Sequence, residues 1–181
     1  MVYVFLADGF EIVEALAPVD MLTRAKVDVI TVGVTGKEVV SSCGVKVIAD
    51  MSISDFIFDS NSIDAIILPG GMPGTLNLEK NTIVQSAIDS SVANNILVCA
   101  ICAAPSILGH KGLLDGKNAI CFPGFEDTLL GAKLSNDYVV TDGNFITAKG
   151  AGVATQFGLE IVKKIKGEKV ADEVRAMIQC L

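Results

Sequence analysis

The sequence has no cluster of lysines or arginines and no long apolar segment. Its 181 residues include 14 basic and 21 acidic side chains, so the formal net charge is −7. An acidic chain without a basic patch lacks the positive surface that attracts nucleic acids and anionic membranes. The apolar segments, such as residues 65–68 and 96–102, are much shorter than the roughly 20 residues that span a bilayer. We therefore expect neither nucleic acid nor membrane as a partner.

The sequence also lacks the basic and apolar segments of a secretion signal, because an apolar strand pattern begins at residue 2. Five cysteines are scattered along the chain, at positions 43, 99, 102, 121 and 180. An odd number of cysteines without a secretion signal does not indicate a disulfide framework. We expect a cytoplasmic protein without structural disulfides.

The chain has a single histidine, His110, which limits the metal sites that it can build. Cys99 and Cys102 form a C-x-x-C motif, but no cysteine or histidine lies at zinc-finger spacing around His110. Cys99 lies inside an apolar run, whereas a thioredoxin-type motif opens a helix. No G-K-[ST] follows the glycine-rich turn near residue 70, so a phosphate loop is absent as well. We expect no metal and no cofactor.

Short apolar segments alternate with longer segments in which apolar residues recur every three or four positions. The short segments, predicted as strands, are 2–6, 27–34, 64–68, 96–100 and 145–148. The longer ones, predicted as helices, are 11–25, 81–93, 104–114, 151–166 and about 169–180. Nearly all-apolar strands are buried on both faces, and strand–helix alternation requires parallel crossovers. The pattern predicts one α/β domain over residues 1–181, a three-layer sandwich with a small hairpin inserted in 36–51.

Cys102 lies where an apolar strand meets a predicted helix. Small residues, Ala100 and Ala104, stand two positions before and after it, as the strained turn of a nucleophile elbow requires. A helix start also favours a thiolate, because its N–H groups and dipole lower the pKa of a thiol. A small buried cysteine without chemistry is the alternative. His110 is interpreted as a helix-end residue rather than a base for Cys102, since eight helical residues span roughly 12 Å.

Glu11 and Glu14 follow the turn after the first predicted strand. In open α/β sheets, ligands bind at this carboxyl edge of the strands. Pro18 is expected to bend the helix, because it removes the N–H that would bond the Glu14 carbonyl. A glutamate that faces an apolar crevice stays protonated more readily and then donates a hydrogen bond to a thiolate. Acidic residues are also frequent in first helical turns, so a solvated surface role stays open.

Two glycine-rich turns follow other predicted strands. Gly70 and Gly71 come after the third strand, and Gly150 comes after the last. Glycine allows backbone N–H groups to approach a ligand, so Gly71 and Ala103 are candidate donors to an oxyanion. Glycine turns often do no more than end a strand, and that alternative also stays open.

Taken together, four motifs closely resemble the ThiJ/PfpI superfamily, and within it the DJ-one branch, over essentially the whole chain. The motifs are DGFEIVE at 8–14 with PVD at 18–20, LPGG at 68–71, AICAAP at 100–105 and GAG at 150–152. The resemblance implies a flavodoxin-like α/β sandwich with a mostly parallel sheet, usually assembled as a homodimer. It also implies that Cys102 is the nucleophile-elbow cysteine, that Glu14 is its protonated partner, and that Gly71 and Ala103 supply the oxyanion contacts.

The chain departs from this family at three positions. Ala103 replaces the histidine that follows the nucleophile in the protease-like branch, so a peptidase is not expected. Phe122 stands where close relatives of DJ-one often carry a histidine, although ThiJ-type bacterial members also lack it. Cys43 stands where many members carry an arginine. Loss of this cation weakens anion binding near the site. The thiol in its place would allow a redox disulfide with Cys102 across a dimer interface. A plain hairpin cysteine is the preferred interpretation. The expected pocket lining is Glu11, Gly70, Gly150, Phe122 and Cys43.

The residues and the resemblance together predict cofactor-free chemistry on small reactive carbonyls. In this interpretation Cys102 attacks a 2-oxoaldehyde, Glu14 moves the proton, and a 2-hydroxy acid is released, as in a glyoxalase or deglycase. The alternative is an oxidative-stress sensor or protective protein whose Cys102 is oxidised to sulfinic acid without turnover. A third interpretation, a chaperone or interaction protein, would make Cys102 dispensable. The expected partners are therefore a small carbonyl or oxidant and a second copy of the chain.

Overall fold

The computed structural model describes residues 1–180; Leu181, the last residue of the predicted domain, lies outside the described part. Seven strands form one sheet in the order β10-β11-β7-β6-β1-β2-β5. Every neighbouring pair is parallel except β10 and β11. The strands are β1 (Val2–Leu6), β2 (Val29–Gly33), β5 (Met51–Ser52), β6 (Ala65–Leu68), β7 (Leu97–Ile101), β10 (Val139–Asp142) and β11 (Phe145–Ala148). The predicted α/β sandwich with a mostly parallel sheet is confirmed.

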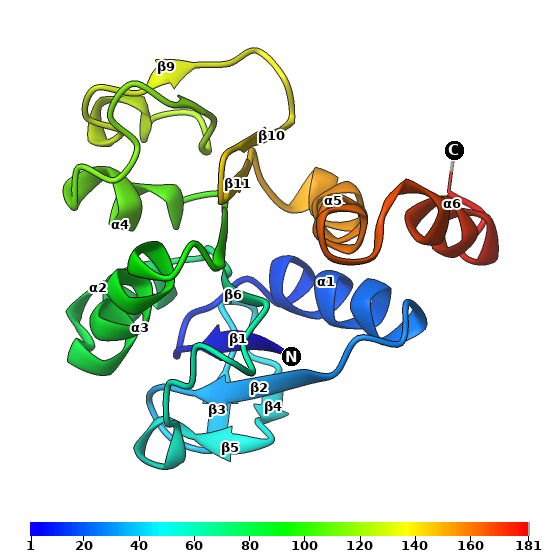
Figure 1. Ribbon diagram of the computed structural model, residues 1–181. Coiled ribbons are helices and arrows are strands. Elements are labelled where there is room, and N and C mark those ends of the chain that lie inside the picture. Colours follow the sequence, from blue (N-terminus) through cyan, green and yellow to red (C-terminus); the bar gives the residue numbers. More distant parts are fainter. Residues whose placement is uncertain (181) are drawn as a thin grey trace.

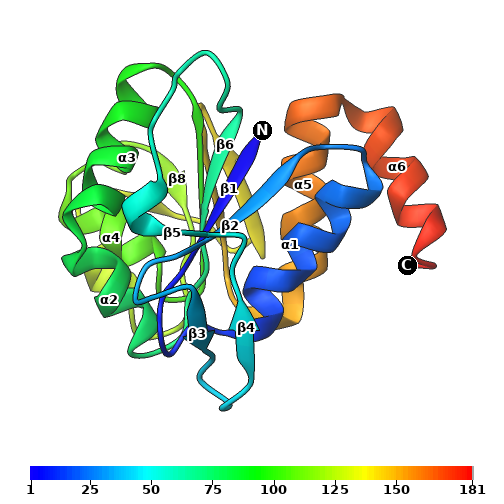
Figure 2. The same ribbon diagram turned by 90° about the horizontal axis from the view of Figure 1, so that it is seen from below.

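Helices cover both faces of this sheet (Figures 1 and 2). One face carries α1 (Ile12–Arg24) and α5 (Ala154–Lys166), with α6 (Glu168–Met177) packed on α5. The other face carries α2 (Gly74–Lys80), α3 (Thr82–Ala93) and α4 (Pro105–His110). Two small sheets, β3 (Glu38–Val40) with β4 (Lys46–Ile48) and β8 (Asn118–Ala119) with β9 (Lys133–Leu134), complete the fold. Three short 3-10 helices are η1 (Ile53–Asp55), η2 (Glu126–Thr128) and η3 (Ala151–Val153).

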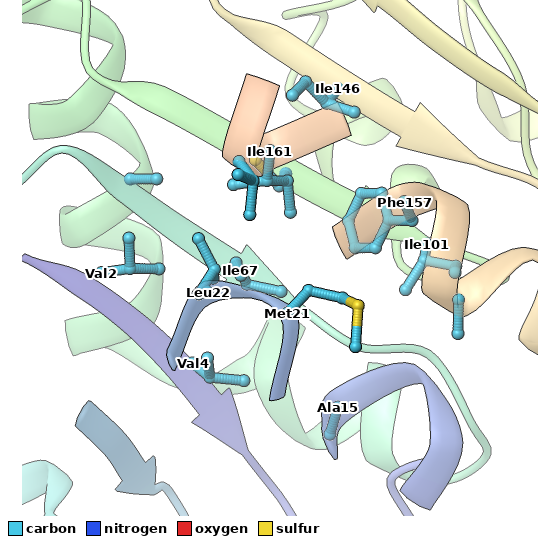
Figure 3. Packing of buried hydrophobic residues seen from close by; sticks show 14 of the residues in the cluster. Val2, Val4, Ala15, Met21, Leu22, Ile67, Ile101, Ile146, Phe157 and Ile161 are labelled. Atoms are coloured by element: carbon cyan, nitrogen blue, oxygen red, sulfur yellow. The ribbon is translucent and has the colours of Figure 1, made fainter. Parts of the chain in front are cut away.

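The hydrophobic core consists of two layers, one on each face of the sheet. Side chains alternate along a strand, so Val2 and Val4 of β1 face α1 whereas Tyr3 and Phe5 face the opposite layer. Figure 3 shows strand residues of the first layer packed against α1 and α5. The residues labelled there include Val2, Val4, Ile67, Ile101, Ile146, Met21, Leu22, Phe157 and Ile161. The close packing of α5 on α1 requires a glycine at position 158 of α5, since a Cβ there would lie 2.9 Å from the Cα of Pro18 in α1.

The predicted elements differ from the observed ones mainly at their ends. The helix predicted over 104–114 ends at His110, because Gly112 has a φ of +68° that an α-helix does not accommodate. The helix predicted over 151–166 begins as a 3-10 turn, and α5 proper starts at Ala154. The hairpin expected in 36–51 is present as β3 and β4. Helix α2 and strand β10 were not predicted; α2 is short, and β10 is an antiparallel edge strand with only one fully buried residue.

The carboxyl ends of the parallel strands bring the predicted loops to one edge of the sheet. After β1 the chain moves to β2 on one side, whereas β6 and β7 lie on the other side of β1. The ends of β1 and β6 therefore flank the point where the strand order reverses, which is where such folds bind ligands. None of the helices described for residues 1–180 combines the length and hydrophobicity that a transmembrane segment requires.

Candidate active site

Cys102 occupies a strained turn between β7 and α4. Its φ is +65°, in the left-handed region that residues other than glycine rarely adopt. Two hydrogen bonds hold this backbone: the Cys102 N–H donates to the Ala148 carbonyl at 2.9 Å, and the Phe122 N–H donates to the Cys102 carbonyl at 2.8 Å. Ala103 and Ala104 are buried, so the turn has little room for larger side chains. This is the geometry of a nucleophile elbow.

Glu14 lies on α1 and is buried, with only 1% of its surface exposed. It belongs to the stripe of α1 that faces the sheet, together with Ala15 and Pro18. Its Oε2 accepts a hydrogen bond from the Gly70 N–H at 2.9 Å. The carboxyl group also lies near the Cys102 thiol and the Ala151 N–H, both of which lower its pKa. A solvated surface role is thus wrong for Glu14.

Burial raises the proton affinity of both ionisable groups. Burial raises the pKa of Glu14 from 4.5 to about 7, against the lowering effect of its hydrogen bonds with Cys102 and Gly70. Burial, followed by the charge and hydrogen bond of Glu14, raises the pKa of the Cys102 thiol to about 12. Between these values the pair holds one proton and one negative charge, and a thiolate forms when that proton lies on Glu14.

The depressed pKa that the sequence predicted for Cys102 is wrong. Helix α4 has only six residues and begins at Pro105, three residues beyond the thiol. The N–H groups of Ala103 and Gly71 do lower the pKa of Cys102, but burial and the neighbouring carboxylate outweigh them. Reactivity at this site therefore depends on the proton of Glu14 rather than on a helix dipole.

The loop after β6 requires glycine at two successive positions. A Cβ at Gly70 would lie 2.7 Å from the Cys102 Cβ and 2.7 Å from Oε2 of Glu14. Gly71 has a φ of +89°, and a Cβ there would lie 2.4 Å from the Glu11 nitrogen. The N–H groups of Gly71 and Ala103 lie near enough to the Cys102 sulfur to lower its pKa, so an oxyanion formed on a carbon bonded to this sulfur would lie near two donors.

Substitution of Gly70 by alanine should separate Cys102 from Glu14. The added methyl group has no space between the two side chains, so one of them must move by several tenths of an ångström. We expect a lower melting temperature and faster alkylation of Cys102 by iodoacetamide at mildly alkaline pH, because the Glu14 charge that raises the pKa of the thiol moves away. Wild-type alkylation in a folded Gly70→Ala protein would contradict this assignment of the Gly70 contacts.

Glu11 and Cys43, two residues expected to line the pocket, lie toward the β3–β4 hairpin. Oε2 of Glu11 accepts a hydrogen bond from the Ser42 hydroxyl at 3.0 Å, and the charge of Glu11 contributes to the raised pKa of Glu14. Cys43 is exposed, and its sulfur lies 3.2 Å from the Ser41 hydroxyl. Cys43 and Cys102 are both free thiols in the structure.

Phe122 and Gly150, two further residues expected to line the pocket, lie next to each other near Glu14. They belong to the lining of a pocket of about 430 Å³, which neither Cys102 nor Glu14 lines directly. A Cβ at Gly150 would lie 3.2 Å from Cδ2 of Phe122 and 4.0 Å from Oε1 of Glu14. Gly150 therefore marks the border between the pocket and the carboxyl group.

Sequence reasoning missed the contact of Ala151 with Glu14. The Ala151 N–H is one of the donors that lower the pKa of the carboxyl group. It lies in η3, directly before α5, where backbone N–H groups have no partner within the helix. The signal was present in the sequence, since a glycine turn followed by a helix at the carboxyl edge exposes such donors. His110 ends α4 as predicted, and its Nδ1 lies 2.6 Å from Oε1 of Glu79.

The stability of the protein should depend on pH through Glu14. Because folding raises the pKa of Glu14, its protonation stabilises the fold fully below pH 4.5, and this contribution is lost as the pH rises through about 7. The difference corresponds to roughly 3 kcal/mol. Urea unfolding at several pH values should show that the difference in the free energy of unfolding between wild type and Glu14→Gln changes by about this amount. A difference that is constant from pH 4 to 8 would contradict the raised pKa.

The protein is a mostly parallel α/β sandwich. It has a strained cysteine at a strand-to-helix turn and a buried glutamate beside that cysteine. These features define a nucleophile-elbow class of protein. No group of three or more histidine, cysteine, aspartate or glutamate side chains within residues 1–180 is arranged to hold a metal ion. The chain belongs to the DJ-1/PfpI family, whose family model matches residues 1–164.

Individual relatives align with nearly the whole chain. The chain is 35% identical to the Parkinson disease protein 7 homolog of Danio rerio over 177 residues, which covers 96% of this chain and 93% of the relative. It is 30% identical to the glutathione-independent glyoxalase DJR-1.2 of Caenorhabditis elegans over 159 residues, covering 87% and 83%. A crystal structure of a mutant of the DJ-1 superfamily protein STM1931 from Salmonella typhimurium superposes with a TM-score of 0.92 at 32% identity, covering 99% and 98%.

Proposed function

We propose that the protein converts small 2-oxoaldehydes into 2-hydroxy acids without a cofactor. The observation that carries this proposal is the contact between the Cys102 thiol and the buried carboxyl group of Glu14. A carboxyl group with a pKa of about 7 exchanges its proton readily near neutral pH, as a general acid and base must. The name of the Caenorhabditis elegans relative, a glutathione-independent glyoxalase, supports the same class of reaction.

The proposed reaction begins with addition of the Cys102 sulfur to the aldehyde carbon. Glu14 gives its proton to the new oxyanion, which lies near the N–H groups of Gly71 and Ala103, and a hemithioacetal results. The Glu14 carboxylate then removes the proton from that carbon and returns it to the neighbouring carbonyl carbon, while the hydroxyl proton of the hemithioacetal moves to the neighbouring oxygen. The first carbon is thereby oxidised to a thioester and the second is reduced to an alcohol. One water molecule hydrolyses the thioester, so no external oxidant or reductant is needed.

The proposal is tested by steady-state conversion of methylglyoxal with lactate measured as the product. We expect many equivalents of lactate per protein molecule in a metal-free buffer. Product must be identified, because any thiol consumes aldehyde by forming an adduct. Aldehyde loss without lactate would overturn the proposed reaction.

The second candidate function, oxidation sensing, is favoured by the same donors. Cys102 is partly exposed, so a peroxide has access to it, and the N–H groups of Gly71 and Ala103 would bind a sulfinate oxygen. Limiting hydrogen peroxide should then add the mass of two oxygen atoms to Cys102 and leave the buried Cys99 unchanged. Oxidation of this kind together with an absence of lactate formation would favour the sensor over the enzyme.

We also propose a homodimer located in the cytoplasm. The family resemblance supports the dimer, and the absence of disulfides at Cys43, Cys99, Cys102 and Cys121 fits a reducing compartment. Light scattering coupled to size-exclusion chromatography measures the first property, and localisation of the tagged protein in cells measures the second.

A further inference from the structure

The pocket beside Gly150 is the part of the site that the proposed reaction leaves unused. Its volume of about 430 Å³ lies within the range of small-molecule sites. The lining consists of Phe122, Pro123, Tyr138, Lys149, Gly150, Ala151, Gly152 and Val153. Lys149 is the single charged side chain of this lining. The methyl group of methylglyoxal would leave most of such a pocket empty.

The pocket is joined to the reacting groups through two short connections. The Phe122 N–H donates to the carbonyl of Cys102 at 2.8 Å, which ties one wall of the pocket to the nucleophile. A Cβ at Gly150 would lie 4.0 Å from Oε1 of Glu14, so this glycine separates the pocket from the carboxyl group. A substituent on a carbon bonded to the Cys102 sulfur can therefore pass over Gly150 into the pocket.

Two aromatic rings on the pocket wall are unusually exposed. Phe122 is 46% exposed and Tyr138 is 62% exposed. The ammonium group of Lys149 lies 5.2 Å from the centre of the Tyr138 ring, and this cation–π contact holds the ring at the pocket. Exposed aromatic faces gain most from covering by a flat apolar group, because stacking adds to the burial of apolar surface.

We propose that this pocket binds the substituent of the substrate and that this substituent is aromatic. The inference rests on the proposed function and narrows its substrates to aryl 2-oxoaldehydes, of which phenylglyoxal is the simplest. The reaction converts phenylglyoxal and water into mandelate, with the same internal transfer of a proton between the two carbons. Phe122 is then a specificity-determining residue, and Gly150 keeps the path to the pocket open.

Binding to the Cys102→Ser protein tests the pocket without any turnover. Isothermal titration should show that mandelate, the product with a phenyl group, binds at least about tenfold more tightly than lactate. Phe122→Ala should abolish this preference by removing the ring. Gly150→Val should abolish it by filling the path, and its φ of 163° is an extended value that valine also adopts. Ile57→Ala, which removes an 81% exposed apolar side chain outside the pocket, should keep the preference.

Turnover by proteins that retain Cys102 provides the second measurement. For the wild-type protein, kcat/KM for phenylglyoxal should exceed that for methylglyoxal by at least about tenfold, and Phe122→Ala should reduce this ratio toward one. A preference for mandelate in binding without turnover of either aldehyde would support the pocket and overturn the proposed function. Lactate formation with equal binding of mandelate and lactate would keep the proposed function and overturn the aromatic pocket. Substitutions that change only the monomer–dimer equilibrium would identify the pocket as a contact between copies, which also overturns the inference.

Discussion

Replacement of Cys102 by serine should abolish the formation of lactate from methylglyoxal, lowering kcat/KM by at least about a thousandfold. The proposed route passes through a thioester, and the serine hydroxyl is a much weaker nucleophile than a thiolate at neutral pH. Glu14 cannot compensate, because a carboxyl group with a pKa of about 7 does not deprotonate an alcohol to a useful extent. The measurement is lactate produced per protein molecule, with the aldehyde in excess.

The control for this experiment is Cys43→Ser, which removes a more exposed thiol. The sulfur of Cys43 contacts the Ser41 hydroxyl rather than any group at the elbow, so we expect lactate formation to persist in this variant. Thermal unfolding of Cys102→Ser should resemble that of wild type, since oxygen is smaller than sulfur and fits the same turn. Lactate formation that survives Cys102→Ser would refute the elbow cysteine as the nucleophile.

The fold was predictable because each of its layers has a pattern that the sequence alone displays. Strands buried on both faces are apolar throughout, and α1 and α5 carry apolar residues on one side. The inserted hairpin was predictable because the spacing of apolar residues changes after β2. Helix α2 was not predicted because seven residues are too few to show a periodic pattern. Strand β10 was not predicted because an antiparallel edge strand is only half buried and lacks a continuous apolar run.

The candidate site was predictable as a set of loops but not as a set of contacts. Small residues around Cys102 indicated a tight turn, and its φ of +65° has the strain that such a turn requires. Glu11 and Glu14 could not be separated by local sequence, because both belong to the first turns of one helix. The Gly70 loop contacts both residues, because the Glu11 N–H donates to the Gly70 carbonyl at 2.9 Å. The side chains differ: that of Glu14 is buried and accepts from the Gly70 N–H, whereas that of Glu11 accepts from the Ser42 hydroxyl of the hairpin.

The sign of the pKa change at Cys102 lay beyond sequence reasoning for a different reason. A helix start lowers the pKa of a thiol, and that effect can be inferred from the position of the helix. Burial raises the pKa of the same group, and so does the charge of Glu14, which the fold brings to Cys102 from a distant part of the sequence. Where the two effects oppose each other, only the packed structure determines which one is larger.

Substitution of Glu14 by glutamine should separate turnover from oxidation. Glutamine has nearly the same shape, its amide oxygen still accepts the Gly70 N–H, and its amide nitrogen donates to a thiolate, but it cannot carry a proton between two carbons. We expect lactate formation to fall by about 100- to 10,000-fold. Oxidation of Cys102 by limiting peroxide should persist, because the neutral amide removes the charge that raises the pKa of the thiol. Turnover equal to that of wild type would refute the role of Glu14 as base.

The pH profile of Cys102 alkylation distinguishes this role from a purely structural one. In the wild-type protein the pair loses its first proton with a pKa of about 7, and the state with one proton includes the reactive thiolate. The rate of reaction with limiting iodoacetamide should therefore rise with a midpoint near pH 7 and then level off. In Glu14→Gln this step should vanish, which leaves only the ionisation of the thiol itself. If both proteins show the same midpoint, the shared proton is absent and the acid–base part of the proposed reaction fails, whatever the rate of turnover.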